Sequence, residues 1–281
     1  MISFQYMRCP GPSDDPRYMI EKVMNMGHGS KRLVVVMMLA IALAASAFAS
    51  DTATVNHFEP LIGDEEYGAL LEHVFNDEGL DGALTRYADL VAAIPYRYYD
   101  PWMMYASLSR ACLIVGKYGS EKGRDDIAQA YFTAADQQTE LARQYGAPES
   151  VTDVLSALSD SFWYLLDSSM SRGMGFSKKV DKAWDAHPED LHVALLKGAK
   201  YQSAPGIVGG SKKKGIALFH EIEENTRDME MAVWDRFSLY QGLAISEDQM
   251  KNGEKALEYA EKAYEIYRAD PEVNRIREKY L

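Results

Sequence analysis

Apolar residues recur at helical spacing along nearly all of the chain after residue 64, and turn-forming clusters interrupt them about every 12 to 20 residues. Two such apolar faces are Tyr67, Leu70, Leu71, Val74 and Leu84, Tyr87, Leu90, Val91. Alternating strand patterns of useful length are hard to find. The spacing predicts an all-α chain of about ten helices joined by short loops, in which each helix buries one face against its neighbours.

The helices repeat as helix-turn-helix units. In a repeat of about 34 residues, small residues let the two helices approach closely and an aromatic ring fills the space between units. The best match in this chain consists of Gly116, Ala128, Phe132 and Ala135, with Gly123 in the turn between the helices. This spacing predicts a close contact between the glycine of the first helix and the aromatic ring of the second.

Other stretches repeat the same spacing with departures. Two further matches are Leu71, Ala83, Tyr87, Leu90, Pro95 and Ala244, Ala256, Ala260, Ala263. A fourth unit has Gly198, Gly215, Phe219 and Ile222, and a loop from Ser203 to Gly210 is inserted between its helices. Residues 152–176 fit poorly, which predicts a degenerate unit there.

These units together resemble the tetratricopeptide-repeat (TPR) family over most of residues 64–270. The resemblance implies a TPR-like helix-turn-helix solenoid with a concave groove that binds another protein or a peptide. Carried over to this chain, the groove positions are Gly68, Glu72, Phe75, Leu113, Lys117, Ser120, Leu195, Ala199, Gln202, Gln241, Ile245 and Asp248. Lys117 is the one cation among them, so the groove suits a peptide with apolar anchors, or a small apolar solute, better than an acidic tail.

The stretch from His187 to Ile222 (HPEDLHVALLKGAKYQSAPGIVGGSKKKGIALFHEI) carries a second resemblance. It looks like exported bacterial helical-repeat proteins that have a proline and a Gly-Gly loop between paired helices. The T-component of tripartite ATP-independent periplasmic (TRAP) transporters is one such family. This resemblance implies a periplasmic subunit with a ligand-lined pore that works beside a solute-binding protein.

An apolar run near the N-terminus indicates the compartment. Lys31 and Arg32 precede thirteen apolar residues, 33–45, and Ala47-Phe48-Ala49 follows as a cleavage pattern. This order is typical of a secretory signal peptide over residues 24–49, which predicts a periplasmic or secreted domain over 50–281. Residues 1–23 are interpreted as a non-native or disordered extension. The alternative is an uncleaved anchor, which would be the chain's only contact with a membrane, although the run is slightly short for a span.

Charge and cysteine content exclude several classes of protein. The formal net charge is −12, which argues against nucleic-acid binding because phosphate backbones require a basic surface. The two cysteines, Cys9 and Cys112, are too few for a disulfide scaffold or a multi-cysteine zinc site. Cys112 is expected to be buried and unreactive.

No set of residues in the sequence indicates catalysis. The histidines lack a metal-ligand spacing such as H-E-x-x-H, and we interpret His187 and His192 as surface residues of a turn. The glycine-rich loop before Lys212 lacks a phosphate-binding motif, so Ser211 is expected to cap a helix whose lysines are solvated or contact an anion. The sequence therefore predicts a protein without catalytic residues, metal or cofactor, and an enzyme that uses an unrecognised site is a third possibility.

Aromatic residues and the inserted loop supply the candidate binding residues. Tyr98 and Tyr99 fall in a linker, where amphipathic rings often anchor a ligand or partner. The full set of candidates is Tyr98, Tyr99, Trp102, Lys117, Tyr201, Gln202, Pro205, Gly209 and Gly210. The first functional hypothesis is a non-enzymatic protein-interaction scaffold, and the alternative is a solute-handling component of a TRAP-type transporter with an aromatic-lined tunnel. An open groove favours the first, and a closed aromatic tunnel favours the second.

Overall fold

The computed structural model describes residues 55–57, 61, 64–94 and 100–281. The chain divides into two compact units, residues 1–50 and 51–281, and only the second contains described residues. The expected extension, the signal peptide, Tyr98 and Tyr99 all lie outside the described residues.

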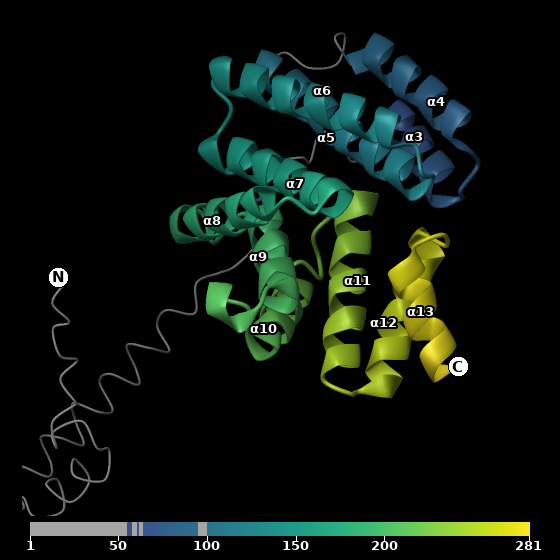
Figure 1. The fold of residues 1–281 in the computed structure, drawn as a ribbon, viewed down its shortest axis with the longest axis vertical. Coiled ribbons are helices and arrows are strands. Elements are labelled where there is room, and N and C mark those ends of the chain that lie inside the picture. The colour runs from purple at the N-terminus through teal and green to yellow at the C-terminus, as the bar shows by residue number, and fades with distance from the viewer. Residues whose placement is uncertain (1–54, 58–60, 62–63, 95–99) are drawn as a thin grey trace, which may run out of the picture. The chain divides into compact units, whose positions relative to one another are not determined.

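The described residues form α-helices and one short 3-10 turn, with no strand among them, which confirms the all-α expectation. Figure 1 labels the α-helices of the described residues, α3 to α13. Their bounds are α3 Glu65–Phe75, α4 Leu80–Ala93, α5 Pro101–Glu121, α6 Asp125–Gln144, α7 Glu149–Asp167, α8 Met170–Ala186, α9 Leu191–Ser203, η4 Gly206–Val208, α10 Lys212–Asn225, α11 Val233–Gln249, α12 Gly253–Ile266 and α13 Pro271–Tyr280.

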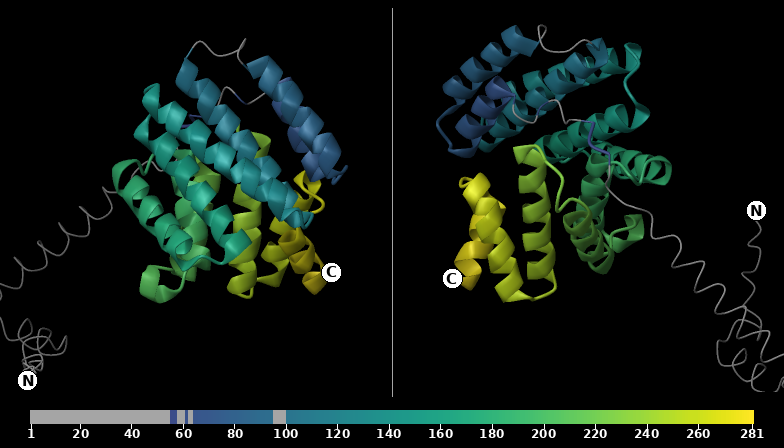
Figure 2. Two further views of the ribbon diagram at one scale, coloured as in Figure 1. Left: turned by 45° about the horizontal axis from the view of Figure 1, so that its top comes forward. Right: turned by 180° about the vertical axis from the view of Figure 1, so that it is seen from behind.

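Consecutive helices pack in pairs, which are α3 with α4, α5 with α6, α7 with α8, α9 with α10 and α11 with α12. The first helices of successive pairs also contact one another, from α3 through α5, α7 and α9 to α11. Figure 2 shows this stacking from two further directions. The pattern is that of a helical-repeat solenoid. The stretch 152–176, expected to be degenerate, lies in α7 and α8, which form a regular pair.

The predicted contacts between glycine and aromatic residues are present. A β-carbon added at Gly116 in α5 would lie 2.5 Å from the ring of Phe132 in α6. In the fourth pair, the buried ring of Phe219 lies between two glycines, Gly198 of α9 and Gly242 of α11. Added β-carbons would lie 2.8 Å and 2.4 Å from this ring. The helices therefore approach as closely as they do because glycine leaves room for the ring.

The inserted loop separates α9 from α10, as the sequence indicated. It contains the turn η4, and Gly209 has a φ of 90°, a conformation that favours glycine. A β-carbon at Gly210 would lie 1.7 Å from the carbonyl oxygen of Ala204, so only glycine fits there. The side chain of Ser211 then accepts a hydrogen bond from the backbone N–H of Lys214 and caps α10, as expected.

The two ends of the array meet across its inner face. Helix α3 contacts α11, and the ring of Phe75 in α3 stacks on that of Tyr267, which follows α12, at 4.9 Å between centroids. Phe75, Leu113 and Leu195, which the repeat spacing places in an open groove, are buried. Large apolar side chains on the inner face pack against one another because this contact removes them from water.

Candidate binding site on the inner face

Five side chains converge where α3, α5, α11 and the end of α12 meet, and we call this region the inner seam. Its members are Phe75, Lys117, Trp234, Gln241 and Tyr267. Phe75, Lys117 and Gln241 are groove positions that the repeat spacing predicted, from three different units. Trp234 stacks on Phe75 at 5.8 Å between ring centroids. Neither Trp234 nor Tyr267 is among the candidates from the sequence, because nothing local indicates that these rings meet the first helix.

Lys117 is the charged centre of the inner seam. Its Nζ lies 5.8 Å from the ring centroid of Trp234 and 5.2 Å from that of Tyr267, within the range of a cation–π interaction. It also forms an ion pair with Glu121, one turn further along α5. Its side chain is 21% exposed, so a ligand that reaches the inner seam can contact it.

Two carboxylates surround this lysine. The hydroxyl of Tyr267 donates to Glu121 Oε2 at 2.7 Å, and both burial and this carboxylate raise the pKa of Tyr267. The amide of Gln241 donates to Asp270 Oδ2 at 2.9 Å, and burial raises the pKa of Asp270. An ammonium, an amide and aromatic faces beside two acids can hold a small polar-aromatic ligand without a negative charge.

A buried ion network ties the inner helices together behind their surface. Arg110 of α5 forms an ion pair with Asp235 of α11, and its Nη1 lies 3.1 Å from Nε2 of His192 on α9. The same His192 nitrogen lies 3.1 Å from Asp235 Oδ2. The expectation that His192 is a surface turn residue is therefore wrong. Helix α9 starts at Leu191, so His192 lies in its first turn and faces α5 and α11.

The charges of this network stabilise one another. Burial alone would raise the pKa of Asp235, but the charges of Arg110 and His192 outweigh it and hold this pKa at about 2. Burial alone would lower the pKa of His192, but Asp235 and a hydrogen bond with Asp190 raise it. The three buried side chains therefore act as structural charges, remote from solvent.

Acidification should weaken the network in a defined pH range. The pKa of Asp235 is about 2 in the folded chain and near 3.8 in the unfolded chain. The charge of Asp235 therefore stabilises the fold above pH 3.8, and this stabilisation is lost as the pH falls towards 2. We expect Asp235→Asn to lower the free energy of unfolding by at least about 2 kcal/mol at about pH 5. The difference in the free energy of unfolding between wild type and variant should then become smaller by about 2 kcal/mol as the pH falls towards about 2. Urea titrations at a series of pH values measure it. A difference that does not change with pH would contradict the assignment.

The remaining sequence candidates do not join the inner seam. Gln202 donates from Nε2 to the carbonyl oxygen of Gly242 at 2.8 Å, which ties α9 to α11. Tyr201 lies between the lysine amines of Lys197 and Lys214, at 5.0 and 5.7 Å from its ring centroid. Trp102 is half-buried at the start of α5. The other three, Pro205, Gly209 and Gly210, belong to the inserted loop.

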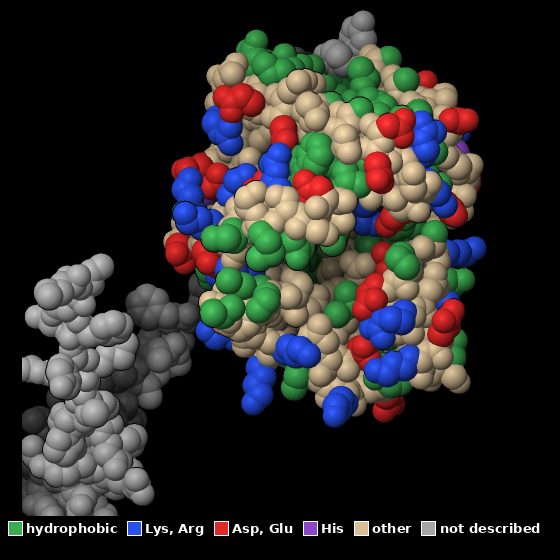
Figure 3. Space-filling model, in the orientation of Figure 1, with side chains coloured by type: hydrophobic (Ala, Val, Ile, Leu, Met, Phe, Trp, Pro, Cys, Tyr) green, Lys and Arg blue, Asp and Glu red, His purple; other side chains and the backbone are tan. Residues whose placement is uncertain are grey.

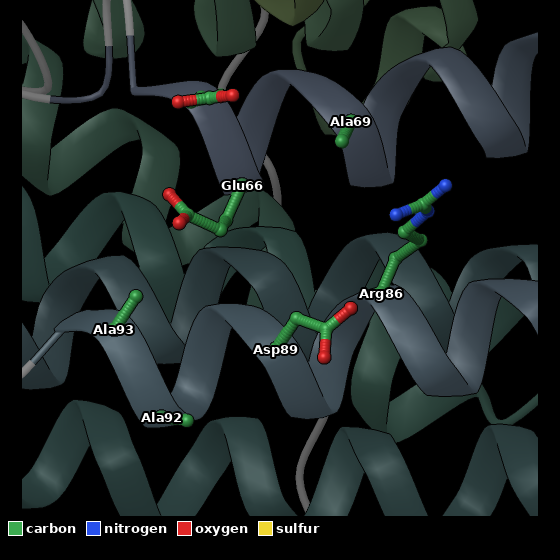
Figure 4. Close-up of a pocket in the computed structure, with 7 residues that line it drawn as sticks. Glu66, Ala69, Arg86, Asp89, Ala92 and Ala93 are labelled. Carbon is green, nitrogen blue, oxygen red and sulfur yellow. The ribbon is translucent and has the colours of Figure 1, made fainter.

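An open hollow of about 570 Å³ lies between α3 and α4 on another part of the surface (Figure 4). Alanines of both helices and four charged side chains line it: Glu65, Glu66, Ala69, Arg86, Asp89, Ala92 and Ala93. It is wide open to solvent, and its lining gathers no aromatic ring from the described residues. It therefore matches a ligand site less well than the inner seam does.

Reactive groups outside the inner seam are few in the described part of the chain. Cys112 is buried there, as expected, with its Sγ 3.0 Å from the hydroxyl of Tyr87. Burial raises the pKa of the Cys112 thiol to about 11, so it stays protonated and unreactive at neutral pH. The described residues contain no cluster of three or more His, Cys, Asp or Glu side chains that could hold a metal ion.

No family model matches the chain, and the searches of curated proteins and of solved structures find no significantly similar protein. Within the described residues, no helix has both the length and the apolar composition needed to cross a membrane.

Proposed function

We propose that this chain is an exported, non-enzymatic helical-repeat protein of the TPR type that binds a small organic solute at the inner seam. The observation that carries the proposal is the convergence of Lys117 from α5 with Trp234 and Gln241 from α11 beside the buried ring of Tyr267, because these first three side chains stay partly exposed. Aromatic faces give a ligand apolar contact, and the ammonium and the amide fix its orientation.

The contact between the walls of the inner seam favours a small ligand over a polypeptide. Phe75 and Tyr267 come from opposite ends of the array and lie 4.9 Å apart. A helix with its side chains is about 10 Å across, so it does not fit between these walls. These two rings are themselves in contact, so a small planar or short-chain solute would bind beside them, against the half-buried ring of Trp234. This arrangement agrees with the solute-handling role that the resemblance to the TRAP T-component implies, with a separate solute-binding protein as a partner.

A scaffold that binds a peptide is the second candidate. Two groove positions favour this role, since Ala199 of α9 and Ile245 of α11 are only half-buried and a peptide could contact them. Their polar neighbours are engaged within the chain, since Gln202 donates to Gly242 and Asp248 pairs with Arg275. A peptide bound here would therefore contribute mainly apolar side chains.

Native mass spectrometry of the full chain, purified without denaturation from a periplasm, tests the proposal. We expect a small-molecule mass that dissociates on unfolding. Lys117→Ala should weaken the affinity for this molecule at least about tenfold, because a hydrogen bond to a charged group contributes roughly 1.5–3 kcal/mol. Lys262→Ala is the matched control, since Lys262 also lies over a tyrosine ring, 4.6 Å from the centroid of Tyr259, but on α12 away from the inner seam.

The other outcomes separate the two candidates. A small-molecule mass that both variants keep would move the site elsewhere and contradict the proposal. A chain that carries only a polypeptide would favour the scaffold.

A further inference from the structure

Large apolar side chains are exposed where α7 meets α8. Leu165, Met170 and Met174 are 73%, 71% and 63% exposed, and Tyr164 beside them is also exposed. In the inserted loop, Ile207 of η4 is 95% exposed. We call these five residues the apolar edge. Solitary exposed apolar residues are ordinary, but a group of this size on one protein indicates a surface that contacts something.

The two parts of the apolar edge lie close together. The amine of Lys200 donates to the carbonyl oxygen of Ser177 on α8 at 3.2 Å, and a β-carbon placed on Gly209 would lie 3.7 Å from the same amine. The inserted loop is therefore packed beside the middle of α8. In Figure 3, hydrophobic side chains gather over α8 and the η4 turn, with Lys and Arg side chains around them and over α10.

The same region is basic, although the chain as a whole is acidic. Residues 170–214 hold nine Lys and Arg against three Asp and one Glu, in a chain whose net charge is −12. Lys178, Lys212 and Lys213 are exposed and have no ion-pair partner among the described residues. Lys212 and Lys213 also lie in the first turn of α10, where positive charge opposes the helix dipole. These lysines therefore do not serve to stabilise the helix.

The first described residues also lie beside the C-terminal end of α8. Val55 accepts from Leu191 and donates to Glu189, so it is hydrogen-bonded to the turn between α8 and α9. The sequence that precedes Val55 includes the apolar run 33–45. Exposed apolar residues, unpaired lysines and this connection thus all occur around α8.

We propose that the apolar edge and its lysines dock on an anionic lipid surface. Exposed leucine, methionine and isoleucine side chains enter the boundary between headgroups and acyl chains, and lysines beside them attract acidic headgroups. The predominantly acidic remainder of the chain is repelled by such a surface, which orients the protein with this edge towards the lipid. The inner seam is a separate site, so this proposal is independent of the solute-binding role.

Methionine oxidation reports on the apolar edge directly. The full chain is treated with hydrogen peroxide beside vesicles of pure phosphatidylcholine, or of phosphatidylcholine with about 30% phosphatidylglycerol, at low salt. We expect the anionic vesicles to slow the oxidation of Met170 and Met174 at least about threefold. Met250, which is 37% exposed at the end of α11, is the internal control and should be oxidised at an unchanged rate.

Charge-reversal variants test the role of the lysines. Lys212→Glu/Lys213→Glu should abolish the protection of both methionines. Lys251→Glu/Lys255→Glu changes the net charge equally, also at the start of a helix, and should preserve it. Equal protection by neutral vesicles would overturn the proposal. So would protection without vesicles that grows with protein concentration, since a second copy of the chain would then cover the edge. Absence of any protection would overturn it too.

Discussion

Replacing Arg110 with methionine should lower the free energy of unfolding by about 3–5 kcal/mol, because it leaves Asp235 as a buried carboxylate without its strongest partner. Arg110 and Asp235 are both almost fully buried and come from α5 and α11. Solvent cannot replace the lost guanidinium there. Urea denaturation at neutral pH, followed by circular dichroism, measures the change.

Two further variants distinguish this effect from a general loss of packing. Arg143→Ala removes an exposed arginine that pairs with Glu140, and should cost less than about 0.5 kcal/mol. The double variant Arg110→Met/Asp235→Leu should be more stable than Arg110→Met alone, because no buried carboxylate is then left unpaired. If the effects of the two substitutions on the free energy of unfolding were simply additive, the loss of stability in Arg110→Met would not come from the unpaired carboxylate of Asp235.

The second large effect concerns the ring of Phe219. Gly242→Ala should lower the free energy of unfolding by about 1–3 kcal/mol, because the new β-carbon would lie 2.4 Å from a ring that Gly198 confines on its other side. Alanine is the better helix former by about 1 kcal/mol, so a loss of stability means that the steric conflict is larger than this gain. Thermal and urea unfolding of the variant measure the net effect.

A glycine-to-alanine substitution in α3 should change the free energy of unfolding in the opposite direction. An added β-carbon at Gly68 meets no atom within 4 Å, and this residue is exposed. Gly68→Ala should therefore raise the free energy of unfolding by up to about 1 kcal/mol. Replacing the ring by a smaller side chain with Phe219→Leu in the Gly242→Ala variant should recover part of the lost free energy of unfolding. Equal effects at both glycines would contradict the close approach of α9, α10 and α11.

Local patterns predicted much of the described fold. The all-α class, the helix pairs, the inserted loop, the cap at Ser211 and the burial of Cys112 all depend on residues near one another in sequence. The contact of Gly116 with Phe132 could be predicted because the fixed spacing of one helix pair sets it. His192 was assigned wrongly, because its neighbours in sequence suggest a turn while its partners lie on distant helices.

Local sequence patterns were enough to predict which segments are helical, how they pair and that Phe75, Lys117 and Gln241 face inward. The closure of the inner face is visible only in the folded chain, because it depends on small rotations accumulated over many repeats, and no local pattern encodes their sum. Arg110 and Asp235 are 125 residues apart in the chain, and Glu121 and Tyr267 are 146 apart. Contacts at such separations follow from the curvature of the whole array, and they are what create the buried network and the inner seam.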